Sequence, residues 1–225
     1  MSSGGSRMVS LAAIILMAVL VVQFCATSVR AQNTVGNPSF ETPQGAAGAE
    51  VGAGAGTSWS TFNAVFLENQ SPGPAEDGNQ YIKVFGGGSG AFQDIPVVPG
   101  EPYTAMSWAR LPANDHAAAG QFQFGQLLVI FRNPSNTGQV GATQADSTVH
   151  FGTGGTDSPS DTWLNSTLTG TVPAGAGFIR LQLNEGASAG GAVWFDNASL
   201  VLPEPASIGL LAVGGVALLR RRQCA

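Results

Sequence analysis

The middle of the chain contains no cysteine. The two cysteines among the 225 residues are Cys25 and Cys224, so no disulfide can hold together a fold built from residues 32–202. A segment of this length does not need one, because a chain of about 150 residues can bury roughly 70% of its unfolded surface in one core. The sequence therefore predicts one domain held by packing, with a metal ion as the other available constraint.

Basic residues are also scarce in residues 32–202. The segment has four of them, Lys83, Arg110, Arg132 and Arg180, against thirteen acidic residues, which gives a formal charge of −9. Proteins that bind nucleic acids concentrate Lys and Arg in order to neutralise phosphates. The composition therefore excludes nucleic acid as a partner.

Long helical patterns are absent from the same segment. Apolar and polar residues alternate instead, as at Ile179, Leu181 and Leu183, and this period of two is typical of strands with one buried face. About ten short strands predict an all-β fold, an antiparallel β-sandwich. The expected strands include 81–85, 103–110, 126–132, 162–172 and 193–201; Gly-, Pro- and Ser-rich turns are expected at 71–74, 86–90 and 152–160, and a long Ala/Gly loop at 45–56.

The N-terminal residues have the order of an export signal. Arg7 precedes the almost wholly apolar residues 8–24, and Val29 and Ala31 place small side chains before Gln32. Residues 1–31 are therefore predicted to be a signal peptide with a helical core. The apolar stretch is long enough to span a bilayer, but its position and the small residues after it favour cleavage over a permanent anchor.

The last 23 residues form a second targeting pattern, in which a proline pair precedes an apolar run (206–219) and a basic cluster. This order resembles the PEP-CTERM sorting signal of bacterial surface and exopolysaccharide-associated proteins. The resemblance implies recognition by an exosortase, a membrane-embedded protease that removes the tail after export. The predicted sorting segment is 203–225, and its motif residues are Pro203, Glu204, Pro205, Arg220, Arg221 and Arg222.

The length of the apolar run favours a transient anchor. As a helix, residues 206–219 would span about 21 Å, less than the roughly 30 Å of a hydrocarbon core. The arginines after it would stay on the cytoplasmic side, which places residues 32–202 outside the inner membrane. The predicted location is the cell envelope, cell surface or extracellular matrix.

Three stretches of the central segment carry a second resemblance: 37–41 (NPSFE), 93–103 (QDIPVVPGEPY) and 193–200 (VWFDNASL). With Trp163 and residues 172–176, they resemble the galactose-binding-domain-like jelly rolls, which include several families of carbohydrate-binding modules. The resemblance covers nearly all of residues 33–202. It implies a jelly-roll sandwich and a polysaccharide as the partner.

In that family the opening and closing strands lie together, often beside a structural Ca²⁺. The matching carboxylates here are Glu41 and Asp196, and Ca²⁺ prefers such oxygen ligands. The resemblance thus implies a structural calcium at these two residues. The alternative is that Glu41 is a solvated strand end and Asp196 an acid with backbone hydrogen bonds.

Sugar binding by such folds uses aromatic rings flanked by polar side chains. Trp108 and Arg110 share one face of an expected strand, and Trp194 faces outward if Val193 and Phe195 face the core. Trp108, Arg110 and Trp194 are therefore the predicted ligand-binding residues, while the other Trp and Tyr residues are expected in the core. Polar residues of 121–124 would add partners for sugar hydroxyls if their face is concave, and the sequence does not determine which face that is.

Catalysis has little support in the sequence. The central segment has only His116 and His150, in different loop-like or strand-end settings, and no His/Cys metal spacing, so no catalytic residue is predicted. The predicted function is that of a non-catalytic, exported surface or matrix protein that binds glycan or exopolysaccharide. Two alternatives stay open: a purely structural matrix protein, and a polysaccharide-degrading enzyme that uses two carboxylates.

Overall fold

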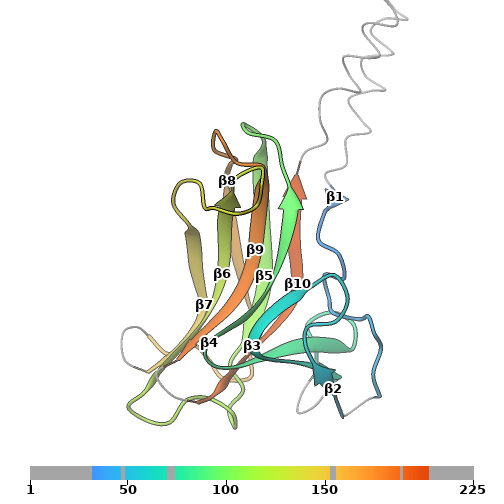
Figure 1. Cartoon of the computed structure of the whole chain (residues 1–225). Coiled ribbons are helices and arrows are strands. Elements are labelled where there is room, and N and C mark those ends of the chain that lie inside the picture. Colours follow the sequence, from blue (N-terminus) through green and yellow to red (C-terminus); the bar gives the residue numbers. More distant parts are fainter. Residues whose placement is uncertain (1–31, 47–48, 70–73, 153–155, 188–189, 203–225) are drawn as a thin grey trace, which may run out of the picture. The chain divides into compact units, whose positions relative to one another are not determined.

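The computed structural model describes residues 32–46, 49–69, 74–152, 156–187 and 190–202 (Figure 1). The predicted signal peptide and sorting segment lie outside these ranges. Residues Asn33–Leu202 form a compact unit with its own hydrophobic core, so this unit can be studied by itself. Within the described ranges, no helix is long and apolar enough to cross a membrane.

The described residues form ten strands and no α-helix, so the all-β prediction is confirmed. The strands are β1 (Gln32–Asn33), β2 (Ala49–Ala53), β3 (Ser60–Asn69), β4 (Gln80–Pro96), β5 (Pro102–Arg110), β6 (Phe122–Arg132), β7 (Gln144–Gly152), β8 (Leu164–Thr171), β9 (Phe178–Ala187) and β10 (Ala192–Leu202).

The pairings among β2–β10 are antiparallel, and these strands build two layers. The first layer contains the beginning of β4, followed by β10, β5 and β8. The second contains the end of β4, followed by β9, β6 and β7, and Figure 1 shows β9, β6 and β7 side by side. β3 pairs with β4 along both of its parts, and β2 pairs with β3. The antiparallel sandwich is therefore confirmed.

Strand β4 belongs to both layers because a glycine-rich corner lies within it. The ladder to β3 shifts register between Phe62 and Ala64, where β4 contributes extra residues. Gly86 and Gly88 have φ angles of 74° and 81° there, which glycine adopts at little cost. The sequence predicted a turn between two strands at 86–90. That prediction was wrong, because the glycines bend one continuous strand.

The Ala/Gly-rich stretch 45–56 was predicted to be a loop, and this prediction was wrong in part. Ala49–Ala53 forms β2, which pairs with the end of β3. Alanine and glycine favour strands weakly, so the sequence alone does not indicate this edge strand. The pairing is available because the neighbouring strand leaves an edge that needs hydrogen-bond partners.

The core lies between the two layers. In the second layer it receives the inward residues of β6 and β9, such as Leu127, Val129, Leu181 and Leu183, which are fully buried. In the first layer Val193 and Phe195 of β10 face the same core. The residues that alternate with these positions point away from the core, so each layer also has an outer face.

Candidate functional site

Two of the three predicted ligand-binding residues are buried beneath the outer face of the first layer. The exposed fraction is 1% for Trp194 and 7% for Arg110. The Trp194 ring stacks on Tyr81 with centroids 4.7 Å apart, and the Arg110 guanidinium lies 4.8 Å from the centre of the Trp194 ring. Trp194 faces away from the main core, as predicted. Its ring is nevertheless covered and cannot meet a ligand in this conformation.

Loops on either side of the first layer cover these rings. The carbonyl of Pro74 accepts hydrogen bonds from the indole N–H of Trp163 (3.2 Å) and from Nη1 of Arg110 (3.5 Å). Asp161 accepts a bond from Nη2 of Arg110 at 2.9 Å, and this bond lowers the pKa of Asp161. The expectation that Arg110 and Trp194 line an open face is therefore corrected: they are packed between the strands and these loops.

Trp108 has a different position. It is half-buried on β5, where its register partners are Asn165 of β8 and Asp196 of β10. It shares the outer face with Arg110, as the sequence predicted. Burial of Arg110 and Trp194 leaves Trp108 without the two neighbours that were expected to form a site with it.

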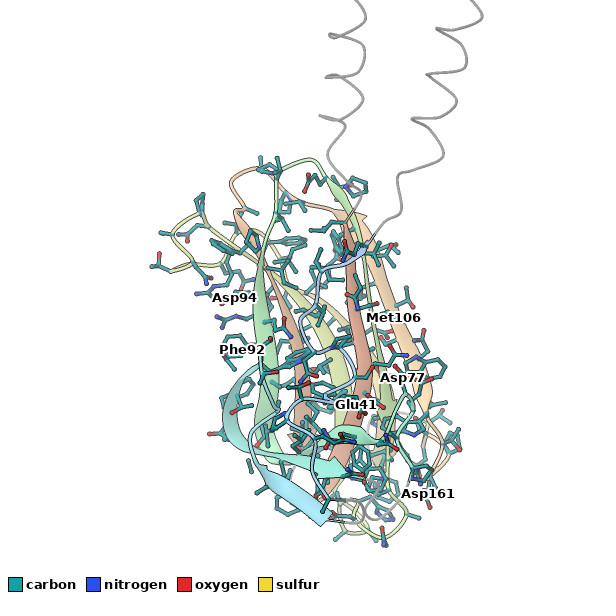
Figure 2. The ribbon with its side chains drawn as sticks, turned by 90° about the vertical axis from the view of Figure 1, so that its right-hand side faces the viewer. Glu41, Asp77, Phe92, Asp94, Met106 and Asp161 are labelled. Carbon is teal, nitrogen blue, oxygen red and sulfur yellow. The ribbon has the colours of Figure 1, made fainter. Side chains whose placement is uncertain are left out.

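The predicted metal-site carboxylates lie on either side of the loop that leads into β4. Asp196 is fully buried and accepts backbone N–H bonds from Glu76 (2.8 Å), Asp77 (2.9 Å) and Asn197 (2.7 Å). Oε1 of Glu41 accepts two more, from the N–H groups of Asn79 and Gln80 at 2.7 Å each. Figure 2 labels Glu41 and Asp77 on this part of the molecule.

The surroundings of Asp196 act on its titration in opposite directions. Burial raises the pKa of Asp196 to about 8, although the backbone donors of Asp77, Asn197 and Glu76 act to lower it. Among the described residues, no three His, Cys, Asp or Glu side chains gather as a metal-ligand set. Oε1 of Glu41 and Oδ2 of Asp196 accept bonds from backbone amides of residues 76–80, and Oδ1 of Asp196 accepts the bond of Asn197. The residues present thus fit a hydrogen-bonded loop, and the calcium stays a prediction.

A second candidate site lies on the outer face of the second layer, formed by the beginning of β3 and the end of β4 with β9, β6 and β7. The outward side chains here, which we call the second-layer face, are Phe62, Phe92, Phe124, Gln126, Gln182 and Asn184. All six are half-buried, since they alternate along their strands with core residues. The face therefore combines phenylalanine rings and side-chain amides.

Two of the phenylalanine rings lie across glycines of neighbouring strands. A Cβ built on Gly90 would lie 2.6 Å from Cζ of Phe62, and one built on Gly186 would lie 2.2 Å from Cζ of Phe124. Both glycines are register partners of those phenylalanines. The rings occupy the space that a side chain would otherwise fill, so each ring rests over a neighbouring strand.

Asn184 lies between the two rings. It is the register partner of Gly90 and stands two residues before Gly186 on β9. Its side-chain amide has no hydrogen-bond partner among the described residues, and the same holds for Gln182, two residues earlier on this face. The next amide in the row, Gln126, donates to Ser147 of β7 at 3.1 Å. Unpaired amides beside apolar rings can meet the hydroxyl groups and the C–H face of a sugar.

The charged end of this face is ordered by a network around Asp94. Arg180 donates to Asp94 through Nε and Nη2 at 2.8 Å each and stacks on Phe92, with 3.8 Å from its guanidinium carbon to the ring centre. Asn136 also donates to Asp94, and its side-chain and backbone oxygens accept bonds from Arg132. Hydrogen bonds from Arg180 lower the pKa of Asp94, and the nearby charge of Arg132 adds to this effect. Figure 2 shows Phe92 and Asp94 on one side of the molecule.

The sequence left open which face of residues 121–124 is available to a ligand, and the structure decides it. Gln123 is fully buried, where it donates to the buried carboxylate of Glu185 at 3.2 Å, so it is not available to sugar hydroxyls. Phe122 and Phe124 face outward instead. The available signal was the next stretch of β6, because Leu127, Val129 and Phe131 share the alternation of Gln123 and are the stronger core residues.

No family model and no curated protein matches the sequence. Several solved structures are similar. The enzymatically active domain of tailspike protein 4 from bacteriophage CBA120 matches with a TM-score of 0.51 and 16% identity, over 76% of this chain and 21% of that one. This chain thus spans about a fifth of the length of that domain. This similarity shows a shared fold.

Carbohydrate-binding modules are also among the similar structures. A xylan-binding domain of family 22 matches with a TM-score of 0.47 and 13% identity, over 80% of this chain and 98% of that one. The module TmCBM61, solved with β-1,4-galactotriose, has a TM-score of 0.47 and 16% identity, over 75% of this chain and 97% of that one. Both matches extend over nearly the whole of these modules.

Proposed function

We propose that the protein is an exported, non-catalytic surface or matrix protein that binds glycan through the second-layer face. One observation carries the proposal: the rings of Phe62 and Phe124 rest on glycines to either side of Asn184, whose amide has no partner among the described residues. A pyranose offers an apolar C–H face and a rim of hydroxyls. Fixed rings with an amide between them complement both features without large ordering costs.

The charges on this face favour binding over hydrolysis. A glycosidase needs two carboxylates roughly 5–10 Å apart around the scissile bond. Among the described residues of the face and its charged end, Asp94 is the one acid, and Arg180 holds both of its oxygens. Glu185 alternates with the outward residues of β9 and is fully buried. This part of the molecule therefore supports a binding role.

The targeting part of the proposal depends on the two ends of the chain, which lie outside the described residues. Residues 1–31 would direct export, and 203–225 would hold the protein transiently in the membrane until an exosortase removes the tail. Ca²⁺ would be a structural cofactor at Glu41 and Asp196, with no catalytic part.

Polysaccharide binding tests the first part of the proposal. Residues 32–202 are run in native gels that contain single polysaccharides, both neutral and acidic. Wild-type protein should be retarded by at least one polymer, and the Gln182→Ala/Asn184→Ala double variant should lose this retardation. The matched control is Thr167→Ala/Thr169→Ala, which removes two exposed polar side chains from β8 in the first layer. Migration of the wild type unaffected by any polymer would favour the purely structural alternative.

Fractionation tests the sorting part. When Pro203, Glu204 and Pro205 are replaced by alanine in the full chain, an uncut precursor is expected in the membrane fraction, whereas the wild type should appear outside the cell with its tail removed. Mass spectrometry of the exported protein would locate both cleavage points. Wild-type protein found only in the cytoplasm would contradict export altogether.

A further inference from the structure

We infer that the glycan bound by the second-layer face carries carboxylate groups, as a uronate-containing polysaccharide does, and that its carboxylate binds at Arg132 and Arg180. This inference rests on the proposed function and names the class of ligand for the same face. It is carried by the distribution of charge in the protein and by the free donors of these two arginines.

Positive charge is concentrated at one end of this face. Residues 32–202 contain four basic and thirteen acidic residues. Arg132, Arg180 and Asp94 together carry a charge of +1, so the remaining two basic and twelve acidic residues carry −10. The other two cations are already engaged, Lys83 with Asp115 and Arg110 with Asp161. Among the described residues, an acidic ligand therefore meets one locally favourable region, the end of the second-layer face that carries Arg132 and Arg180.

Both arginines keep donors for a ligand. Arg180 uses Nε and Nη2 for Asp94, and Arg132 uses Nε and Nη2 for the oxygens of Asn136. Nη1 of each guanidinium has no partner among the described residues. Arg132 also forms no salt bridge with an acid in the described ranges, so its charge is not compensated by direct contact. A guanidinium with free N–H groups suits the planar oxygens of a carboxylate.

The geometry joins these donors to the rest of the face. Arg180 is the register partner of Ile130, and Arg132 follows two residues later on β6, which puts the two Cα atoms about 7–8 Å apart. Arg180 stands two residues from Gln182 and lies on the ring of Phe92. One polymer could therefore contact the amides with one sugar and the arginines with a neighbouring one.

The overall negative charge does not prevent this contact. At physiological salt the Debye length is about 8 Å, so acids on the first layer are largely screened from a ligand on the second. The nearby Arg132 and Arg180 then contribute more to the electrostatic energy of a bound carboxylate than the distant acids of the first layer. Retention by an acidic polymer should weaken as salt rises, because the contact depends on charge.

Matched polymers test the inference. Residues 32–202 are run in gels that contain polygalacturonate, alginate or glucuronoxylan, each beside its carboxyl-reduced form, which keeps the backbone and removes the charge. The wild type should be retained more strongly by at least one acidic polymer than by its reduced form. Arg132→Gln should weaken that retention roughly three- to fivefold, the scale of one exposed charge pair. Lys83→Gln, which changes the net charge equally but lies in the first layer, should have no effect.

Weaker retention of Arg132→Gln could also result from misfolding, so a variant with stronger expected binding serves as a second test. Asp94→Asn removes the acid next to Arg180 and should strengthen retention by the acidic polymer, an effect that loss of folding cannot produce. Equal retention by acidic and reduced polymers, or no change in Arg132→Gln and Asp94→Asn, would overturn the inference and leave glycan binding intact. Failure of every polymer, neutral or acidic, to retain the wild type would overturn both proposals.

Discussion

The ring of Phe124 on β6 lies across Gly186 on β9, so close that a Cβ on this glycine would stand 2.2 Å from the ring. The two residues are register partners, and the absence of a side chain on one strand determines where the ring of the other strand rests. If the second-layer face binds glycan, this pair fixes the position of one of the two aromatic rings, Phe62 and Phe124, on which the sugar would stack.

Gly186→Ala should therefore reduce glycan retention. The added methyl group would push the Phe124 ring away from β9, since real Cβ atoms do not approach other atoms this closely. The expected loss is at least threefold, of the same order as an aromatic contact of about 1 kcal/mol. Phe124→Leu should have a similar effect. The double variant should lose no more glycan retention than either single variant, because both substitutions act on the same ring. Additive losses of retention would contradict this explanation.

Trp194→Phe should lower stability without changing glycan affinity. The ring is buried between Tyr81 and Arg110, so a smaller ring leaves a gap that costs about 1–3 kcal/mol. The melting temperature and the gel retention of the same preparation are measured together. A folded Trp194→Phe variant with normal stability and lost retention would instead support the ligand role that the sequence predicted.

Calcium should raise the melting temperature of residues 32–202 if it binds at Glu41 and Asp196. Relative to a chelator, a concentration 100 times the dissociation constant would add about 2.7 kcal/mol. Glu41→Gln is the informative variant, since Gln can still accept the N–H bonds of Asn79 and Gln80 but lacks the charge. It should melt like the wild type in chelator and lose the calcium response. An identical melting temperature of the wild type with and without millimolar Ca²⁺ would disprove the calcium prediction.

Stability should fall between about pH 4.5 and pH 7 because of Glu185. Burial raises the pKa of Glu185 from 4.5 to about 7, so in this window the folded state binds more protons than the unfolded state. The contribution of Glu185 is fully present below pH 4.5 and is lost as the pH rises through 7, by about 3 kcal/mol, and Asp196, whose pKa burial raises to about 8, adds a loss of the same sign. Glu185→Gln should make the fall between pH 4.5 and pH 7 less steep, leaving the part due to Asp196, and should exceed the wild type in melting temperature at pH 8. Parallel profiles for the two proteins would contradict the assignment.

The alternation along β6 and β9 predicted the sandwich. A period of two places Ile179, Leu181 and Leu183 on the same face of a strand, and an apolar face of this kind has to be buried. The same rule failed for β4. Gly86 and Gly88 are compatible with a turn or with a corner, and the choice depends on whether β3 and β10 continue the ladder on either side. Those partners are distant in sequence.

The candidate site was less accessible to sequence reasoning. Aromatic residues near polar ones were the signal used for Trp108, Arg110 and Trp194, yet burial depends on what covers a face. Pro74 and Trp163 cover Arg110 and Trp194, and neither is close to them in the chain. The phenylalanines of the second-layer face were overlooked because glycines that support their rings stand on other strands.

The sequence by itself determined the strand-forming pattern, the excess of acid over base, the absence of a central disulfide and the targeting predictions at both ends, since each is a property of composition or of local order. Only the tertiary structure decided which aromatic rings are covered, where β4 bends, and that Arg132 and Arg180 stand together beside Asp94. These properties depend on strand register and on loops that fold back from distant positions, and free energies of burial and hydrogen bonding select them only when the whole sandwich is assembled.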